Sequence, residues 1–150
     1  LNAVLLLVGD YEHRDHPAKS AVDFVSSNSG VRHVGWQTDV VSFMAAMDVL
    51  VLPTYREGFP NVLLEAAAMG IPTVTTDATG ARDAVVNGVT GLTVRVGDAE
   101  GLREAVARLV RDPALREAMG HAGREWVARH FDQRWVWQLQ VEEYRRLARQ

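Results

Sequence analysis

Glu57-Gly58-Phe59-Pro60-Asn61-Val62-Leu63-Leu64-Glu65 is the stretch that decides the fold. It follows an apolar run at residues 49–53, and it leads into an apolar segment that ends at Gly70. Two glutamates, separated by seven residues, flank the change from loop to helix, and Glu65 is the only charge in the predicted helix. A buried strand, a loop and a helix in this order are typical of a crossover unit in a parallel sheet.

Composition narrows the class of protein. A chain of 150 residues suits one domain, and its hydrophobic fraction of 47% is ordinary for a globular protein. A net charge of −3 argues against a nucleic-acid-binding protein, and the lack of cysteine excludes disulfides and thiolate metal sites. Leu1–Asp10 is apolar but has no basic flank, so it is predicted to be a buried strand rather than a signal peptide. Because the chain lacks an initiator methionine, we expect a fragment of a longer protein.

Apolar strand-like runs alternate with helical patterns along the first two thirds of the chain. The predicted strands are Ala3–Val8, Val31–Gly35, Val49–Pro53, Ile71–Thr75 and Gly91–Val94. The predicted helices between them are Pro17–Ser27, Asp39–Met47, Pro60–Met69 and Gly80–Val86. This alternation predicts an α/β fold, a Rossmann-like parallel sheet flanked by helices and covered on both faces. Asn87-Gly88 leaves a hairpin turn open as an alternative.

Three amphipathic helices are predicted after Val96, because apolar residues recur there at helical spacing. Asp98 and Asp112-Pro113 are expected to start the first two. The third carries Trp135 and Trp137, which together with Trp126 are expected to form core or interface rather than a base-stacking surface.

The loop before the predicted central helix has the features of an anion site. Proline suits a helix start because it has no N–H group, and Gly58 lets a ligand approach the backbone closely. The free N–H groups at a helix N-terminus attract negative charge, so a diphosphate could bind there. A plain connection between a strand and a helix is the alternative.

The two glutamates are the candidate functional side chains. We expect the carboxylate of Glu65 to face a cleft, where two adjacent hydroxyls, as on a ribose, would satisfy both of its oxygens, because an unpaired buried charge is costly. A solvent-facing helix residue is the alternative. Glu57 follows the carboxyl end of a strand, where open α/β sheets bind ligands, although a surface charge on a loop would look the same.

Several common signatures are absent. The chain has no G-x-G-x-x-G after a strand, no P-loop and no Asp-x-Asp pair, and its five histidines, including His13 and His16, show no metal-ligand spacing. We therefore expect neither a metal nor another cofactor.

The order of these motifs resembles the C-terminal half of a retaining glycosyltransferase of family 4 with the two-domain GT-B architecture. The matching segments are Val31–Trp36, Met47–Thr54, Glu57–Ala66, Gly70–Val74, Thr79–Gly80, Asn87–Leu92, Met119–Gly120 and Phe131. The resemblance implies that residues 1–150 form a single donor-binding domain for a nucleotide-diphosphate sugar. It also implies that an arginine- and lysine-bearing loop after an earlier strand, and an N-terminal acceptor domain, are missing, so that the fragment is inactive alone.

The resemblance also implies roles for individual residues. Glu57 would lie beside the donor sugar and act in catalysis, and Glu65 would bind the ribose hydroxyls. Backbone amides in the following loop would contact the sugar and the diphosphate, namely those of Gly58, Phe59, Asn61 and Val62. Trp36 and Gln37 would border the nucleobase, mainly through backbone groups.

Residues 79–85 are similar to bacterial enzymes that build capsule or lipopolysaccharide. This similarity implies a UDP-sugar donor, a glycan or lipid-linked acceptor and a cytoplasmic enzyme, peripherally bound at the inner face of the cytoplasmic membrane. The resemblance to family 4 implies retention at the anomeric carbon. The helix with Trp135 and Trp137 would pack on the missing domain.

Other functions remain open at this point. A nucleotide-sugar epimerase would share the architecture, and a non-catalytic flavodoxin-like module would share the shape. A phosphorylase is disfavoured, because it needs a lysine for pyridoxal phosphate and Lys19 is the only lysine in the chain.

Overall fold

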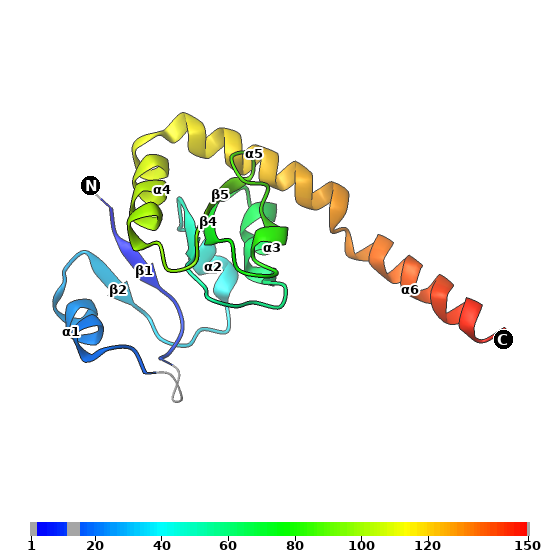
Figure 1. Ribbon diagram of the computed structural model, residues 1–150, viewed down its shortest axis with the longest axis horizontal. Helices are drawn as coiled ribbons and strands as arrows, with labels where there is room; N and C mark the ends of the chain where they lie inside the picture. The colour runs from blue at the N-terminus through cyan, green and yellow to red at the C-terminus, as the bar shows by residue number, and fades with distance from the viewer. Residues whose placement is uncertain (1–2, 12–15, 150) are drawn as a thin grey trace. The chain divides into compact units, whose positions relative to one another are not determined.

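The computed structural model describes residues 3–11 and 16–149, and it divides the chain into two compact units, Leu1–Met47 and Asp48–Gln150 (Figure 1). The prediction of one donor-binding domain over residues 1–150 stays a prediction.

The first unit is a small parallel α/β layer. Its elements are β1 (Leu5–Leu7), α1 (Lys19–Ser27), β2 (Val31–His33) and α2 (Val40–Met44). β1 and β2 pair in parallel, with Leu5 opposite Val31 and Leu7 opposite His33. The Asp39 carboxylate accepts a hydrogen bond from the Ser42 amide and so caps the start of α2.

The second unit holds the central motif and the C-terminal helices. Its elements are β3 (Leu50–Leu52), α3 (Asn61–Ala68), β4 (Thr73–Thr76), the 3₁₀ turn η1 (Arg82–Ala84), β5 (Gly91–Val94), α4 (Ala99–Arg111), α5 (Pro113–His130) and α6 (Gln133–Leu147). The strands form a parallel sheet in the order β3-β4-β5. All pairings between the named strands are parallel, which confirms the predicted sheet type.

Helices cover both faces of this sheet. Leu50 and Leu52 of β3 pack on one face with α3 and the segment around η1, where Leu63 is fully buried. Val51 of the same strand packs on the other face with α4 and α5, among Val74 and Leu109. This three-layer arrangement explains why the strands lack polar alternation, and it confirms that prediction for the second unit.

β4 is the buried centre of the second unit, and all four of its residues are buried. Two of its threonine hydroxyls donate to backbone carbonyls on the β3 side: Thr75 to Leu52 at 2.9 Å and Thr76 to Thr54. The buried hydroxyls are therefore satisfied, as the interior of a protein requires.

The C-terminal helices begin at the residues that the sequence predicts. The Asp98 carboxylate accepts from the Gly101 amide at 2.8 Å, and the Asp112 carboxylate accepts from the Leu115 amide at 2.9 Å. α6 follows directly after α5, and every described residue in it is exposed. Within the described part of the chain, no helix is both long enough and apolar enough to cross a membrane.

The structure corrects one element and several boundaries. Residues 80–86 were predicted to be a helix but contain only the 3₁₀ turn η1, because Gly80 has a φ of +81° and Val85 is extended. The hairpin alternative at Asn87-Gly88 is wrong, because β4 and β5 are parallel. β5 has the predicted bounds, whereas β1, β3 and α2 are shorter than predicted.

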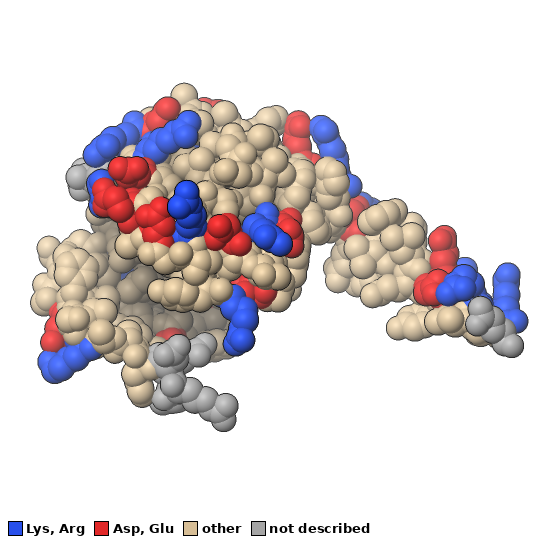
Figure 2. All heavy atoms as spheres, viewed as in Figure 1, with Lys and Arg blue, Asp and Glu red and all other residues tan. Residues whose placement is uncertain are grey.

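Acidic and basic side chains are interspersed on the face shown in Figure 2. On α4, for example, Arg103 pairs with Glu100 and lies 3.9 Å from Glu104. The absence of nucleic acid as a partner stays a prediction.

α5 holds the C-terminal end of α3. Arg124 donates to the backbone carbonyls of Ala68 and Met69, at 3.1 and 2.8 Å, which are among the carbonyls that a helix leaves without partners at its end. Gly120 packs so closely on Gly70 that a Cβ at position 120 would overlap the Gly70 carbonyl oxygen. The two helices therefore meet nearly backbone to backbone.

We predict that Gly120→Ala destabilises the protein by about 1–3 kcal/mol, because the added methyl group forces α5 away from Gly70. Gly123→Ala is the matched control on the same helix: its Cβ would meet the Ala67 Cβ at 3.4 Å, an ordinary contact, and alanine favours a helix by about 0.5–1 kcal/mol. Urea unfolding of both variants measures the difference. Equal stabilities would contradict the close helix contact.

Candidate functional site

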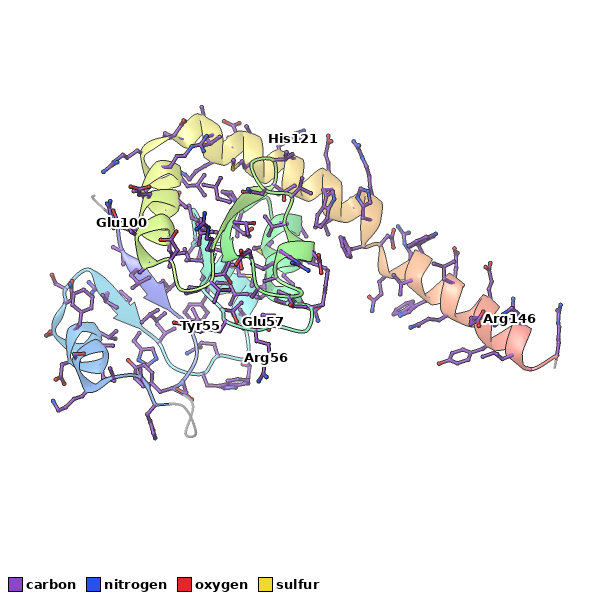
Figure 3. All side chains as sticks on the ribbon, in the orientation of Figure 1. Tyr55, Arg56, Glu57, Glu100, His121 and Arg146 are labelled. Atoms are coloured by element: carbon purple, nitrogen blue, oxygen red, sulfur yellow. The ribbon has the colours of Figure 1, made fainter. Side chains whose placement is uncertain are left out.

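The loop between β3 and α3, residues 53–60, is anchored at its start by Thr54. The Thr54 hydroxyl donates to the Arg56 carbonyl at 3.1 Å and accepts from the Arg56 amide at 3.3 Å. The Thr54 carbonyl in turn accepts from Thr76 of β4. The backbone that leads to Glu57 is thus tied to the central strand, and Tyr55, Arg56 and Glu57 follow one another along it (Figure 3).

A second anchor lies in the middle of the loop. Gly80 has a φ of +81°, and a Cβ at this position would overlap the carbonyl oxygen of Gly58. Only glycine combines this left-handed backbone with so close an approach. The loop after β4 therefore supports the backbone of Glu57 and Gly58 directly.

The loop presents backbone amides that have no acceptor in the described residues. These are the amides of Gly58, Phe59, Asn61 and Val62, the four that the family resemblance singles out. Pro60 is buried and precedes the first helical residue, Asn61. A helix N-terminus with free N–H groups carries partial positive charge, so this end of α3 suits an anionic ligand.

The two glutamates differ in environment. Glu57 is half-buried and Glu65 is exposed, and neither carboxylate has a hydrogen bond or an ion pair in the part of the chain that the structure describes. Asn61, Glu65 and Ala68 form the exposed face of α3, whereas Leu63, Ala66 and Ala67 are buried. The expected enclosure of Glu65 in a cleft is therefore not met within the described residues. Glu65 lies one helical turn from Asn61, on the same face.

The predicted nucleobase loop belongs to the first unit. The Trp36 amide donates to the Asp10 carboxylate at 3.1 Å, and the Gln37 side chain donates to the Val34 carbonyl at 2.7 Å. The Trp36 ring is 75% exposed. The backbone amide of Trp36 is therefore already engaged. The role of this loop stays a prediction.

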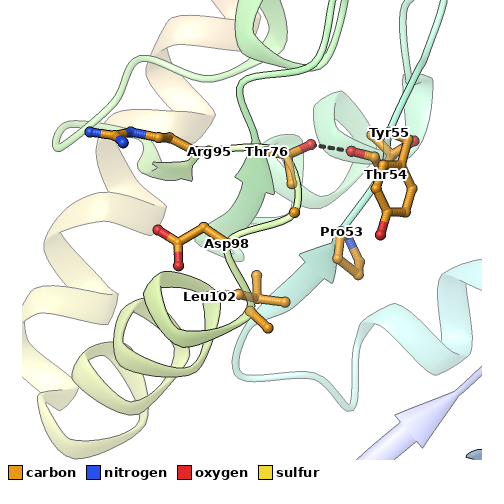
Figure 4. A pocket seen from close by; sticks show the side chains of 9 residues that line it. Pro53, Thr54, Tyr55, Thr76, Arg95, Asp98 and Leu102 are labelled. Atoms are coloured by element: carbon orange, nitrogen blue, oxygen red, sulfur yellow. Dashed lines mark hydrogen bonds between the residues drawn. The ribbon is translucent and has the colours of Figure 1, made fainter.

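A small pocket opens at the carboxyl ends of β3, β4 and β5. It has a volume of about 130 Å³ and is lined by Pro53, Thr54, Tyr55, Thr76, Arg95, Gly97, Asp98, Ala99 and Leu102 (Figure 4). The Arg95 guanidinium extends away from the other labelled side chains. Small-molecule sites usually measure about 300–1,000 Å³, so this pocket is too small for a complete nucleotide sugar. It does show that the carboxyl edge of the sheet is open.

Among the described residues, no group of three His, Asp or Glu side chains lies close enough together to bind one metal ion. His13 lies outside the described residues.

Sequence reasoning missed two functional contributions. The role of Thr54 depends on its hydroxyl, which bonds both the carbonyl and the amide of Arg56. The spacing of residues in a sequence gives no sign of such a contact. The role of Gly80 could have been suspected from its place in the Thr79-Gly80 motif, but its contact with Gly58 joins segments 22 residues apart in sequence.

Comparison with known proteins assigns the family. Residues 2–112 match the model for glycosyl transferases group 1, and the chain therefore belongs to this family. It is 40% identical over 137 residues to the capsular polysaccharide biosynthesis glycosyltransferase CapM of Staphylococcus aureus, covering 91% of this chain and 36% of CapM. It is also 40% identical over 127 residues to the lipopolysaccharide core biosynthesis glycosyltransferase LpsE of Rhizobium meliloti, covering 85% of this chain and 37% of LpsE. The chain thus spans little more than a third of these relatives.

The fold agrees with this assignment. The structure of Anabaena Alr3699/HepE in complex with UDP superimposes with a TM-score of 0.86 at 24% identity, covering 95% of this chain and 40% of that one. The fold is therefore that of GT-B glycosyltransferases, as the sequence predicts.

We predict that Gly80→Ala destabilises the protein more than Gly88→Ala. Both glycines have left-handed backbones, with φ of +81° and +77°, so alanine costs roughly 1–2 kcal/mol at either position. At position 80 the overlap with Gly58 adds about 1–3 kcal/mol, whereas a Cβ at position 88 meets nothing within 4 Å. Urea unfolding gives the free energies, and the amide chemical shift of Gly58 should move in Gly80→Ala alone. Equal losses would show that the backbone contact is not tight.

Proposed function

We propose that this chain binds the donor of a retaining glycosyltransferase, which transfers a sugar from a nucleoside diphosphate, UDP in the first instance, to a glycan or lipid-linked acceptor in polysaccharide or lipopolysaccharide synthesis. The observation that carries the proposal is the set of four unbonded amides beside Glu57, at the start of α3. The activity of the whole enzyme is part of the proposal.

The amides suit the diphosphate of the donor. In transfer, the bond between the anomeric carbon and the diphosphate oxygen breaks, and a bond to the acceptor oxygen forms. Negative charge grows on the leaving diphosphate, which takes up the proton that the acceptor hydroxyl loses. Hydrogen-bond donors that are already oriented stabilise such charge most effectively, because they need no rearrangement during the reaction. The anchors at Thr54 and Gly80 supply this orientation.

The carboxylates suit the two sugars of the donor. Glu57, half-buried at the carboxyl end of β3, would lie beside the transferred sugar, where a positively charged transition state gains from a nearby anion. Glu65, one turn into α3 and without a protein partner in the described residues, would accept hydrogen bonds from both ribose hydroxyls.

Related proteins support these choices in different degrees. The capsule and lipopolysaccharide names of CapM and LpsE support the kind of product, and the HepE structure, solved with UDP, supports a uridine nucleotide. The proposal also includes a cytoplasmic enzyme at the inner face of the membrane, an acceptor-binding region elsewhere in the polypeptide, and transfer without a metal ion.

We predict that UDP raises the melting temperature of this chain and that Glu65→Ala removes most of the gain. UDP at about 100 times its dissociation constant should stabilise by ~2.7 kcal/mol, and each kcal/mol corresponds to roughly 2–4 °C at this size. Glu117→Ala, which removes an exposed glutamate of α5, is the matched control and should retain the full gain. Thermal unfolding with UDP, GDP and ADP makes the measurement.

Two outcomes of this experiment count against the proposal. If none of the nucleotides shifts the melting temperature, either of this chain or of the polypeptide encoded by the full gene, the donor-binding role is rejected. If Glu65→Ala and Glu117→Ala lose equal amounts, Glu65 does not bind the ribose.

We predict that Glu57→Gln lowers kcat of the polypeptide encoded by the full gene by about 10²–10³-fold, the usual loss when one group that stabilises charge in the transition state is removed. UDP affinity should stay within about threefold, because the amides that bind the diphosphate remain in place. Steady-state kinetics and calorimetric titration with UDP separate the two effects. Equal losses in turnover and affinity would assign Glu57 to binding instead.

A further inference from the structure

The loop that carries Glu57 has a third anchor, at the junction of α5 and α6. The ring of Phe59 lies 5.5 Å from the ring of Phe131, and the ring of Phe131 lies 4.9 Å from that of Trp126. The ring of His130 lies 5.7 Å from that of Trp126, in a tilted arrangement. We call Phe59, Trp126, His130 and Phe131 the junction cluster. The spacings are those of packed aromatic rings.

The backbone at the junction is held on both sides of Phe131. The Phe131 amide donates to the Val127 carbonyl at 2.9 Å and ends α5, and the Asp132 carboxylate accepts from the Arg134 amide at 2.9 Å and starts α6. The Arg134 guanidinium and, secondly, the Arg134 amide lower the pKa of Asp132 to about 2, so this cap stays charged at neutral pH. The backbone on both sides of Phe131 is therefore held by hydrogen bonds that do not involve the loop of Glu57.

α5 and the residues at its end contact α3 at its C-terminal end and the loop before α3 at its other end. Arg124 and Gly120 hold the C-terminal end of α3, and the junction cluster holds Phe59, two residues before the first residue of α3. The loop itself contains Gly58, where a Cβ would meet no atom within 4 Å. Glycine gives a loop more backbone freedom than any other residue, so an ordered Gly58 needs anchors on both sides.

We propose that Phe131, backed by Trp126, is a positioning residue for sugar transfer. It fixes the ring of Phe59 and through it the amides of Gly58 and Phe59 and the carboxylate of Glu57. Phe131 acts through Phe59 and touches no substrate. The catalytic part of this proposal rests on the function proposed above, whereas the anchoring of the loop is measured separately.

The first experiment measures the loop itself, by ¹⁵N relaxation of the Gly58 and Phe59 amides in this chain. In Phe131→Ala, the order parameters should fall from the rigid range, about 0.85, to below about 0.6. Phe131→Tyr keeps the ring and should retain the rigid values. Tyr144→Ala, which removes an aromatic ring that is 71% exposed on α6, is the control and should change nothing. Unchanged order parameters in Phe131→Ala overturn the proposal.

The second experiment is a double-mutant cycle in the polypeptide encoded by the full gene. Turnover is followed as UDP release from whichever of UDP-glucose, UDP-galactose, UDP-N-acetylglucosamine and UDP-N-acetylgalactosamine gives the highest rate with the parent protein. Phe131→Ala and Phe59→Ala should each lower kcat on the order of 10- to 100-fold, because misplaced catalytic groups cost rate, and KM for the donor should change much less. Since both variants break one contact, the double variant should lose no more than the larger single loss.

The two experiments distinguish a failure of the positioning role of Phe131 from a failure of the proposed donor-binding function. The positioning role is overturned if the double variant loses kcat by the product of the two single losses. It is also overturned if the order parameters of the loop fall in Phe131→Ala while kcat is unchanged. Phe59→Ala also guards against misfolding of Phe131→Ala, because Phe59 is 42% exposed and its removal leaves the packing of Phe131 on Trp126 in place. A parent protein that responds to no nucleotide would overturn the proposed function and the catalytic role of Phe131, whereas the relaxation result would still decide whether Phe131 anchors the loop.

Discussion

The burial of β4 is the constraint on which the second unit depends. A strand paired on both sides and covered on both faces must satisfy its polar groups internally, because no water reaches them. Thr75 and Thr76 do so by donating to the backbone of residues 52 and 54. These bonds fix the carboxyl end of β3 relative to β4. They therefore determine where the loop with Glu57 begins.

From that point the site is assembled by contacts between backbone segments rather than by charged side chains. Gly80 supports Gly58 from the loop after β4, and the aromatic rings at the end of α5 support Phe59. The result is a row of free amides at the start of α3 that no side chain of the described residues competes for. Such a site is suited to an anion whose charge changes during a reaction, because its geometry exists before the ligand arrives.

Three features of the second unit are not covered within that unit. Glu65 is exposed instead of enclosed, and Trp135 and Trp137 on α6 are 56% and 54% exposed. β3 is an edge strand of its sheet, although its residues, Leu50–Leu52, include no charge of the kind that usually protects an edge.

The sequence by itself determined the class of fold, the order of its elements and the identity of the loop before α3. Buried parallel strands, helix caps and glycines at the ends of helices each leave a local signal in the sequence. Gly91–Val94, Asp98 and Asp112 are such cases. Only the tertiary structure decided that residues 80–86 are not a helix, that Glu65 is exposed, and that Gly80 and Phe131 support the loop of Glu57. The physical reason is that each of these depends on contact between segments far apart in the chain. Periodicity and local propensity carry no record of such contacts.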